Sequence, residues 1–313
     1  MCSTDDLLIN RYRNQLMGVA TLGVLLVHSI DIVHWNSIIE NIVGYGGVGV
    51  YIFVYLSAIG LFISLKTRGV GYKKFDFYKR RFQRVLVPYL LIAGSWYGVK
   101  YLVFQHDILG FLYELSTLSF WIDHQGAWYV AMLIPVYLIF PYFFDWVEGN
   151  SRKCKFTRQI KIISISTIVF IAVFVISIFN PLLYNHLSQV FSSIIVYLLG
   201  YYVADKVICK QYNGYLISSV SIIFFIIKSI TPLKWFDAIH SISWSLLAIP
   251  VLTVSALILS KMKSKVIDSF LGFFGKYSLE IYLWNIFLIQ IIEYFGIKEW
   301  IEKRGDNSGY RIV

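Results

Sequence analysis

Long apolar stretches recur along this chain, and they constrain its fold more than any other feature. The hydrocarbon core of a bilayer is ~30 Å thick, and a helix of roughly 20 apolar residues spans it. Backbone amides in lipid must bond within their own segment, so such stretches are expected to be α-helices. The predicted spans are residues 15–33, 45–65, 85–104, 127–147, 162–179, 187–204, 214–230, 241–260 and 277–297.

The composition argues for a membrane protein and against a soluble one. Hydrophobic residues make up 58% of the 313-residue chain and charged residues only 15%, whereas soluble domains have ~45–50% and ~25%. We therefore predict an all-α, polytopic transmembrane helical bundle of nine to ten spans, with residues 1–313 as a single domain. Two apolar pieces, 108–121 and 266–274, are too short to span and are expected to be re-entrant or interfacial.

The distribution of Lys and Arg predicts the orientation of the chain. The formal net charge is +10, and basic residues concentrate at 66–84 and 152–161, whereas the predicted outer loops hold only Lys234. By the positive-inside rule, the N-terminus lies in the cytoplasm and the chain is a multi-pass protein of the plasma membrane. Basic cytoplasmic loops account for the charge, so no nucleic-acid partner is expected. Nine spans put the basic tail at 298–313 outside, so either a tenth span is missing or one segment is miscounted.

The first predicted span contains an imidazole that could carry chemistry. His28 lies in an apolar helix, and Asp31 follows at i+3 on a neighbouring part of the same face. An imidazole at this depth is costly unless it has a partner or a task, and histidine exchanges protons near neutral pH. Asp31 would orient His28 or stabilise its charged form. The alternative is a histidine that only bonds a neighbouring helix, and the spacing does not decide between the two.

Two further motifs have a structural and a functional interpretation each. The glycine-rich start of the second span favours close helix packing over a phosphate cradle formed by free amides. Arg81 and Arg84 share a helix face just before Pro88, which marks a helix start or kink. Paired arginines suit bidentate phosphate recognition, although a basic flank of a cytoplasmic loop explains them too.

The later helices add aromatic and acidic candidates. Trp128 and Tyr129 are expected to be interfacial belt aromatics. One predicted helix carries Glu280 and Asn285, and Glu280 near its inner end is either solvated or paired with Arg81 or Arg84. No His or Cys cluster has the spacing of a zinc site, so no metal cofactor is expected.

Taken in order, these segments resemble the acyltransferase 3 family of integral membrane acyltransferases. LMGVATLGVLLVH is similar to its first helix, which ends in the candidate catalytic histidine. FYKRRFQRVLVPY resembles its Arg-x-x-Arg-x-x-x-Pro segment. The stretches GGVGVYIFVYLSAIGLFISL, WYVAMLIPVYLIFP and GKYSLEIYLWN resemble its second and later helices.

The resemblance implies transfer of an acyl group, commonly acetyl from acetyl-CoA, to a hydroxyl of an envelope glycan or lipid-linked sugar. His28 would be the catalytic base, with Asp31 and Glu280 as further catalytic candidates. Arg81 and Arg84 would bind the phosphates of acyl-CoA. The expected partners are therefore the lipid bilayer, acyl-CoA as donor and a glycan acceptor.

The chain departs from the family pattern at three places. Met17 stands where the family commonly has an arginine eleven residues before the histidine, and Arg13, one turn earlier, is the expected substitute in the cofactor site. Asn285 stands where the family often has a histidine. The family usually has one more helix after this point, where this chain is polar.

Two other functions compete with acyl transfer. A transporter or flippase of envelope polysaccharide intermediates would use intramembrane Lys100, Lys228, His28 and Glu280 as a polar relay, but we find no internal repeat of the kind common in transporters. A polysaccharide polymerase would need a longer, basic outer loop.

Overall fold

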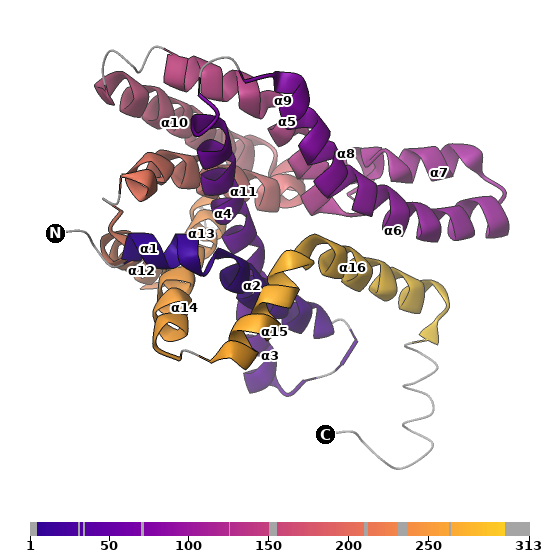
Figure 1. Ribbon diagram of the computed structural model, residues 1–313. Coiled ribbons are helices and arrows are strands. Elements are labelled where there is room, and N and C mark those ends of the chain that lie inside the picture. Colours follow the sequence, from indigo (N-terminus) through magenta and orange to yellow (C-terminus); the bar gives the residue numbers. More distant parts are fainter. Residues whose placement is uncertain are drawn as a thin grey trace.

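The computed structural model describes residues 5–30, 32–33, 35–69, 72–124, 126–149, 155–209, 212–230, 237–262 and 264–297. All regular structure within these ranges is helical, which confirms the all-α class (Figure 1). The first half contains α1 (Asp5–Arg11), α2 (Arg13–Ser29), α3 (Ser37–Gly44), η1 (Tyr45–Gly47), α4 (Val48–Lys66), α5 (Lys74–Arg81), η2 (Phe82–Leu86), α6 (Val87–Tyr97), η3 (Gly98–Phe104), α7 (Ile108–Leu115) and α8 (Leu118–Asp123). The second half contains α9 (Trp128–Gly149), α10 (Lys155–Phe179), α11 (Pro181–Ile208), α12 (Gly214–Ile230), α13 (Asp237–Leu246), α14 (Ala248–Met262), α15 (Lys265–Lys276) and α16 (Ser278–Tyr294).

Every predicted span coincides with a helix, but the helices differ in length. Within the described ranges, six are long and apolar enough to cross a bilayer: Ser37–Lys66, Lys74–Phe104, Trp128–Gly149, Phe156–Phe179, Pro181–Ile208 and Ala238–Met262. The other three predicted spans are the 17-residue helices α2, α12 and α16, each about 26 Å long at the α-helical rise. The chain is thus a helical membrane protein with six helices of full spanning length among its described residues, and the predicted count of nine to ten spans stays a prediction.

The pieces predicted to be too short to span are short helices. Residues 108–121 form α7 and α8, which extend to one side of the bundle together with α6 (Figure 1). Residues 266–274 form most of α15. This helix packs tightly along α2 and leads directly into α16, so it belongs to the bundle itself.

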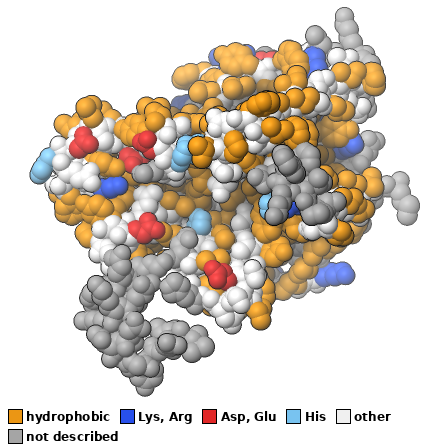
Figure 2. All heavy atoms as spheres, turned by 180° about the vertical axis from the view of Figure 1, so that it is seen from behind, with side chains coloured by type: hydrophobic (Ala, Val, Ile, Leu, Met, Phe, Trp, Pro, Cys, Tyr) orange, Lys and Arg blue, Asp and Glu red, His pale blue; other side chains and the backbone are white. Residues whose placement is uncertain are grey.

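Burial separates central from peripheral helices. In the segment Ser37–Lys66, 72% of the most apolar window is buried, against 11% in Phe156–Phe179. The helix α4 is therefore the centre of the bundle, and α10 lies at its rim. The face shown in Figure 2 carries many hydrophobic side chains with scattered charges, as expected for a surface that faces lipid.

Glycines bring α2 into backbone contact with its neighbours. A Cβ built on Gly46 would lie 2.1 Å from the carbonyl oxygen of Gly23, and one on Gly49 would lie 2.4 Å from that of Ala20. On the other side of α2, a Cβ on Gly275 would lie 1.7 Å from the Asn14 oxygen. At these positions the glycines serve helix packing, which confirms the favoured interpretation of the glycine-rich motif.

A buried ion-pair network attaches the rim helix to the centre. Glu148 on α9 accepts from Arg158 Nε of α10 at 2.7 Å and from Lys66 Nζ of α4 at 2.9 Å. The Arg158 guanidinium also donates to the backbone oxygen of Tyr201 on α11 at 3.0 Å. Four helices therefore meet at one carboxylate.

Candidate active site

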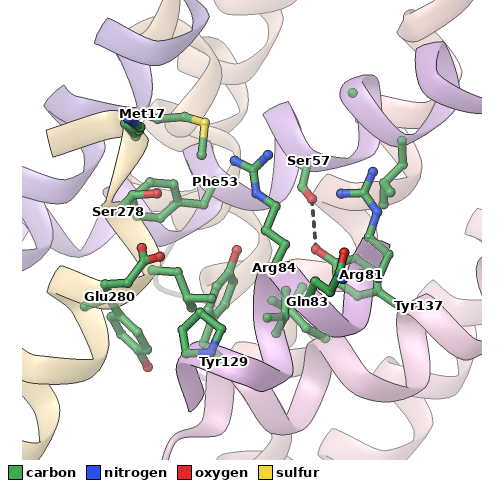
Figure 3. A pocket seen from close by; sticks show the side chains of 18 of the residues that line it. Met17, Phe53, Ser57, Arg81, Gln83, Arg84, Tyr129, Tyr137, Ser278 and Glu280 are labelled. Atoms are coloured by element: carbon green, nitrogen blue, oxygen red, sulfur yellow. Dashed lines mark hydrogen bonds between the residues drawn. The ribbon is translucent and has the colours of Figure 1, made fainter. Parts of the chain in front are cut away.

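A cavity of about 330 Å³ opens among α2, α4, the η2–α6 segment, α9 and the start of α16 (Figure 3). Arg81 and Arg84 enter it from one wall, while Ser278 and Glu280 lie on the opposite one (Figure 3). These helices are far apart in sequence, so only the folded bundle brings the groups together.

The charge of the cavity is strongly positive. Four basic side chains line it, from Arg13, Arg81, Arg84 and Lys276, against the one carboxylate of Glu280. The structure thus brings together all three arginines that the sequence suggested for a cofactor site. The three guanidinium groups are close enough to repel one another, and an anion bound among them would relieve this repulsion.

Two of these arginines have unused donors. Arg13 Nη2 donates to the backbone oxygen of Leu56 at 3.2 Å, but its Nε is buried without a partner. Arg81 Nε is also buried without a partner, while its guanidinium lies 5.8 Å from the ring centroid of Tyr137. Buried polar groups normally find partners, so these donors indicate a site for an anionic acceptor of hydrogen bonds.

The approach of Arg13 depends on a glycine. A Cβ at Gly60 on α4 would lie 2.3 Å from Arg13 Nη2. The missing side chain therefore makes the space that the guanidinium fills. Met17, at the position where the family commonly has an arginine, lies one turn after Arg13 and lines the same cavity. Arg13 can therefore supply a guanidinium group to this cavity in place of an arginine at position 17.

The wider helical turn at η2 sets the direction of the Arg81 and Arg84 side chains. Residues 82–86 form a π-helix that directly precedes Pro88 in the first turn of α6. Such turns often occur at functional sites. Arg81 ends the preceding α-helix and Arg84 lies within the π-turn, and both side chains reach the cavity.

Aromatic rings line one part of the cavity, and here one expectation was wrong. Tyr129 is only 9% exposed and lies inside the bundle, not in an interfacial belt. Its ring centroid lies 6.5 Å from that of Phe53 and 5.6 Å from that of Tyr282. The position directly after the start of α9 turns this side chain inward, and all three residues line the cavity.

His28 lies just beyond this aromatic wall. Its ring centroid is 6.4 Å from that of Tyr282, and its Nδ1 is hydrogen-bonded to Oδ1 of Asn285 on α16. The predicted partner Asp31 lies outside the described residues. The imidazole is half-buried in the bundle, so the structure places it next to the cavity without making it part of the cavity lining.

Glu280 shares the cavity with the arginines but does not pair with them. Among the described residues, its carboxylate forms no ion pair within 4.0 Å of Arg81 or Arg84, so the second of the two alternatives from the sequence is not found. The other residues considered for a transporter relay have separate partners: Lys228 contacts His240, while Lys100 lies over the Tyr101 ring. The transporter relay is therefore not assembled in this structure.

The sequence interpretation missed three groups of the site. Nothing in the sequence placed Lys276 or Gly60 in the site, although both line the cavity. Asn285 was noted as a departure from a family pattern, and a polar amide in an apolar helix was the available signal. Its partner could not be found from spacing, because His28 is 257 positions away.

A bundle of apolar helices that encloses a basic cavity beside an imidazole defines a membrane protein with a site for an anionic ligand. Residues 12–307 match the profile of the acyltransferase 3 family, described as an acyltransferase domain. The chain therefore belongs to this family and is a membrane acyltransferase. No curated protein and no solved structure matches the chain.

Proposed function

We propose that the protein transfers an acyl group, acetyl in particular, from acyl-CoA to a hydroxyl of an envelope glycan or lipid-linked sugar. The observation that carries this proposal is the basic cavity that ends beside His28. Arg13, Arg81 and Arg84 would bind the phosphates of the donor. His28 lies fifteen residues after Arg13, about 22 Å along the helix, so the thioester arm would extend along α2 past Tyr282.

The reaction needs one base and no metal. His28 takes the proton of the acceptor hydroxyl while that oxygen attacks the thioester carbonyl. The carbon–sulfur bond then breaks, and the CoA thiolate leaves with the proton that the imidazolium returns. Asp31 would stabilise the imidazolium, and Glu280 is a second acid–base candidate inside the cavity.

The proposed orientation brings the two substrates from opposite sides. The positive-inside bias supports a multi-pass protein of the plasma membrane with a cytoplasmic N-terminus. Acyl-CoA would then enter at the end where α2 begins, and the glycan would approach from the end where α2 finishes. His28, near the second end of α2, is placed to meet both.

The test is transfer of radiolabelled acetyl from acetyl-CoA to the envelope glycans of membranes that contain the protein. His28→Ala should abolish transfer at an unchanged level of inserted protein, because the variant lacks the imidazole that we propose takes the hydroxyl proton. His106→Ala, an exposed histidine outside the cavity, is the matched control and should keep full activity. A His28→Ala variant with near-normal turnover would remove the base from the mechanism.

A further inference from the structure

The contact between His28 and Asn285 fixes the chemistry of the imidazole. An amide oxygen has lone pairs and no hydrogen, so Asn285 Oδ1 can only accept. The imidazole Nδ1 must therefore donate, which means that it carries the ring hydrogen. In the neutral ring the other nitrogen, Nε2, then holds the free lone pair.

We propose that Asn285 is a positioning residue, which holds His28 in the Nδ1–H tautomer and leaves Nε2 as the atom that takes the acceptor proton. This inference rests on the proposed role of His28 as base. Enzymes with a histidine base commonly orient it through a bond to the second ring nitrogen. Here an uncharged amide from another helix supplies that bond, at the position where the sequence departs from its family pattern.

An amide differs from a carboxylate in this position because it carries no charge. It selects the tautomer but stabilises the imidazolium less than a carboxylate would, so the ring stays available as a base. Asp31, the proposed counter-charge of the imidazolium, lies outside the described residues, and the titratable groups of the neighbouring described helices form no hydrogen bond with the ring. The Tyr282 ring lies 6.4 Å from His28, Glu280 lines the cavity five positions before Asn285, and α4 carries no charged residue between Val48 and Leu65.

The remaining neighbours of α2 bring no charge to the imidazole among the described residues. Tyr45 in η1 stacks on Trp244, with ring centroids 5.0 Å apart. Lys276 at the end of α15 lines the basic part of the cavity, and Asp268 lies two turns earlier on the same helix. Neither contacts His28, so the amide is the polar partner of the ring in this part of the chain.

The backbone contacts of α15 keep the two partners in register. Gly275 meets the backbone of Asn14 near the start of α2, and Thr21 Oγ1 donates to the Phe274 oxygen at 3.3 Å. The helix α16 begins three residues after Gly275 and packs against α2. The short connection from α15 to α16 therefore places Asn285 beside His28.

Two substitutions of similar size separate positioning from packing. Asn285→Leu removes the acceptor and should lower kcat roughly ten- to a hundred-fold, the usual loss when an orienting partner is removed, while KM for acetyl-CoA stays unchanged. Asn285→Asp keeps the acceptor and should restore most of the rate. Its carboxylate favours the imidazolium, so the acid limb of the pH–rate profile should move to higher pH.

A purely structural role for Asn285 predicts other results. The inference fails if Asn285→Leu keeps wild-type kcat. It also fails if the Asn285→Asp profile superimposes on that of the wild type. Equal melting temperatures of the variants in detergent ensure that lost rate is not lost fold.

The tautomer itself can be read without any substrate. In protein labelled with ¹⁵N-histidine, the signal lost in His28→Gln identifies the ring, and the shifts of its two nitrogens show which one is protonated. We expect Nδ1–H in the wild type and a change toward Nε2–H in Asn285→Leu. A wild-type ring with Nε2–H overturns the inference even if the enzyme is active, whereas Nδ1–H in a protein without transferase activity overturns the proposed function alone.

Discussion

Gly275 gives the sharpest test of how the site is held together. A Cβ at this position would lie 1.7 Å from the Asn14 oxygen and 3.0 Å from the Gly18 nitrogen, whereas ordinary contacts begin at 3.4 Å. In Gly275→Ala, the backbones of α15 and α2 would have to separate by about the difference between 1.7 Å and 3.4 Å, since no side chain can rotate away. Overpacking of this kind costs about 1–3 kcal/mol, and contact with backbone atoms puts the cost at the upper end.

The matched control lies one turn earlier on the same helix. A Cβ at Gly272 would meet no atom within 4 Å. Gly272→Ala should therefore leave stability unchanged or raise it by up to about 1 kcal/mol, because alanine is the better helix former. The melting midpoint of purified protein in detergent measures both variants. Equal midpoints, or a higher one for Gly275→Ala, would refute the close approach of α15 to α2.

Gly275→Ala should also lower activity more than stability alone explains. A displaced α15 moves the start of α16 and separates Asn285 from His28. The expected result is a reduced kcat at temperatures well below the melting midpoint. Full activity in a destabilised Gly275→Ala variant would show that the backbone contact supports the fold but not the His28–Asn285 pair.

Three further predictions follow from the charges of the bundle. In Arg81→Lys and Arg84→Lys, apparent affinity for acetyl-CoA should fall by about 1–3 kcal/mol, because an ammonium lacks the planar fork of guanidinium; unchanged affinity in a binding isotherm would leave them as topological anchors. Glu148→Gln leaves a buried guanidinium without its counter-charge and should lower the free energy of unfolding by about 3 kcal/mol, measured by thermal or denaturant melting; a stable variant would mean that the network is solvated. With the other native cysteines replaced by serine, exposed Cys209 should resist an impermeant thiol reagent in intact cells. A cysteine introduced as Ser116→Cys should react, and the opposite pattern would invert the proposed topology.

The helices could be predicted from the sequence because the bilayer imposes one requirement on every span. Each apolar stretch became a helix in the expected order, since lipid leaves the backbone no other partner. Helix length was less predictable. The helix α2 ends at Ser29 and α16 ends at Tyr294, so their apolar stretches exceed their helices by several residues.

The basic part of the site was also accessible from sequence, whereas its far end was not. The charge and spacing of Arg81 and Arg84 predict an anion site, and both residues line the cavity. Tyr129 was assigned to the membrane interface because amphipathic aromatics usually lie there, but the rotation of α9 turns it inward. Pairings such as His28 with Asn285 depend on helix–helix register, which hydrophobicity does not encode.

The π-turn at Phe82–Leu86 has a consequence for chain length among relatives. Its hydrogen bonds close over one residue more than those of an α-helix. A relative that lacks one residue between Arg84 and Pro88 would form this turn as an ordinary α-helix. The residues that follow would keep their present orientation around the helix axis. The guanidinium groups of its two arginines would then project from the helix within about 60° of each other. The angle between them would be narrower than in the π-turn. A one-residue gap at this point in an alignment would therefore mark a different geometry of anion recognition, although both arginines are retained.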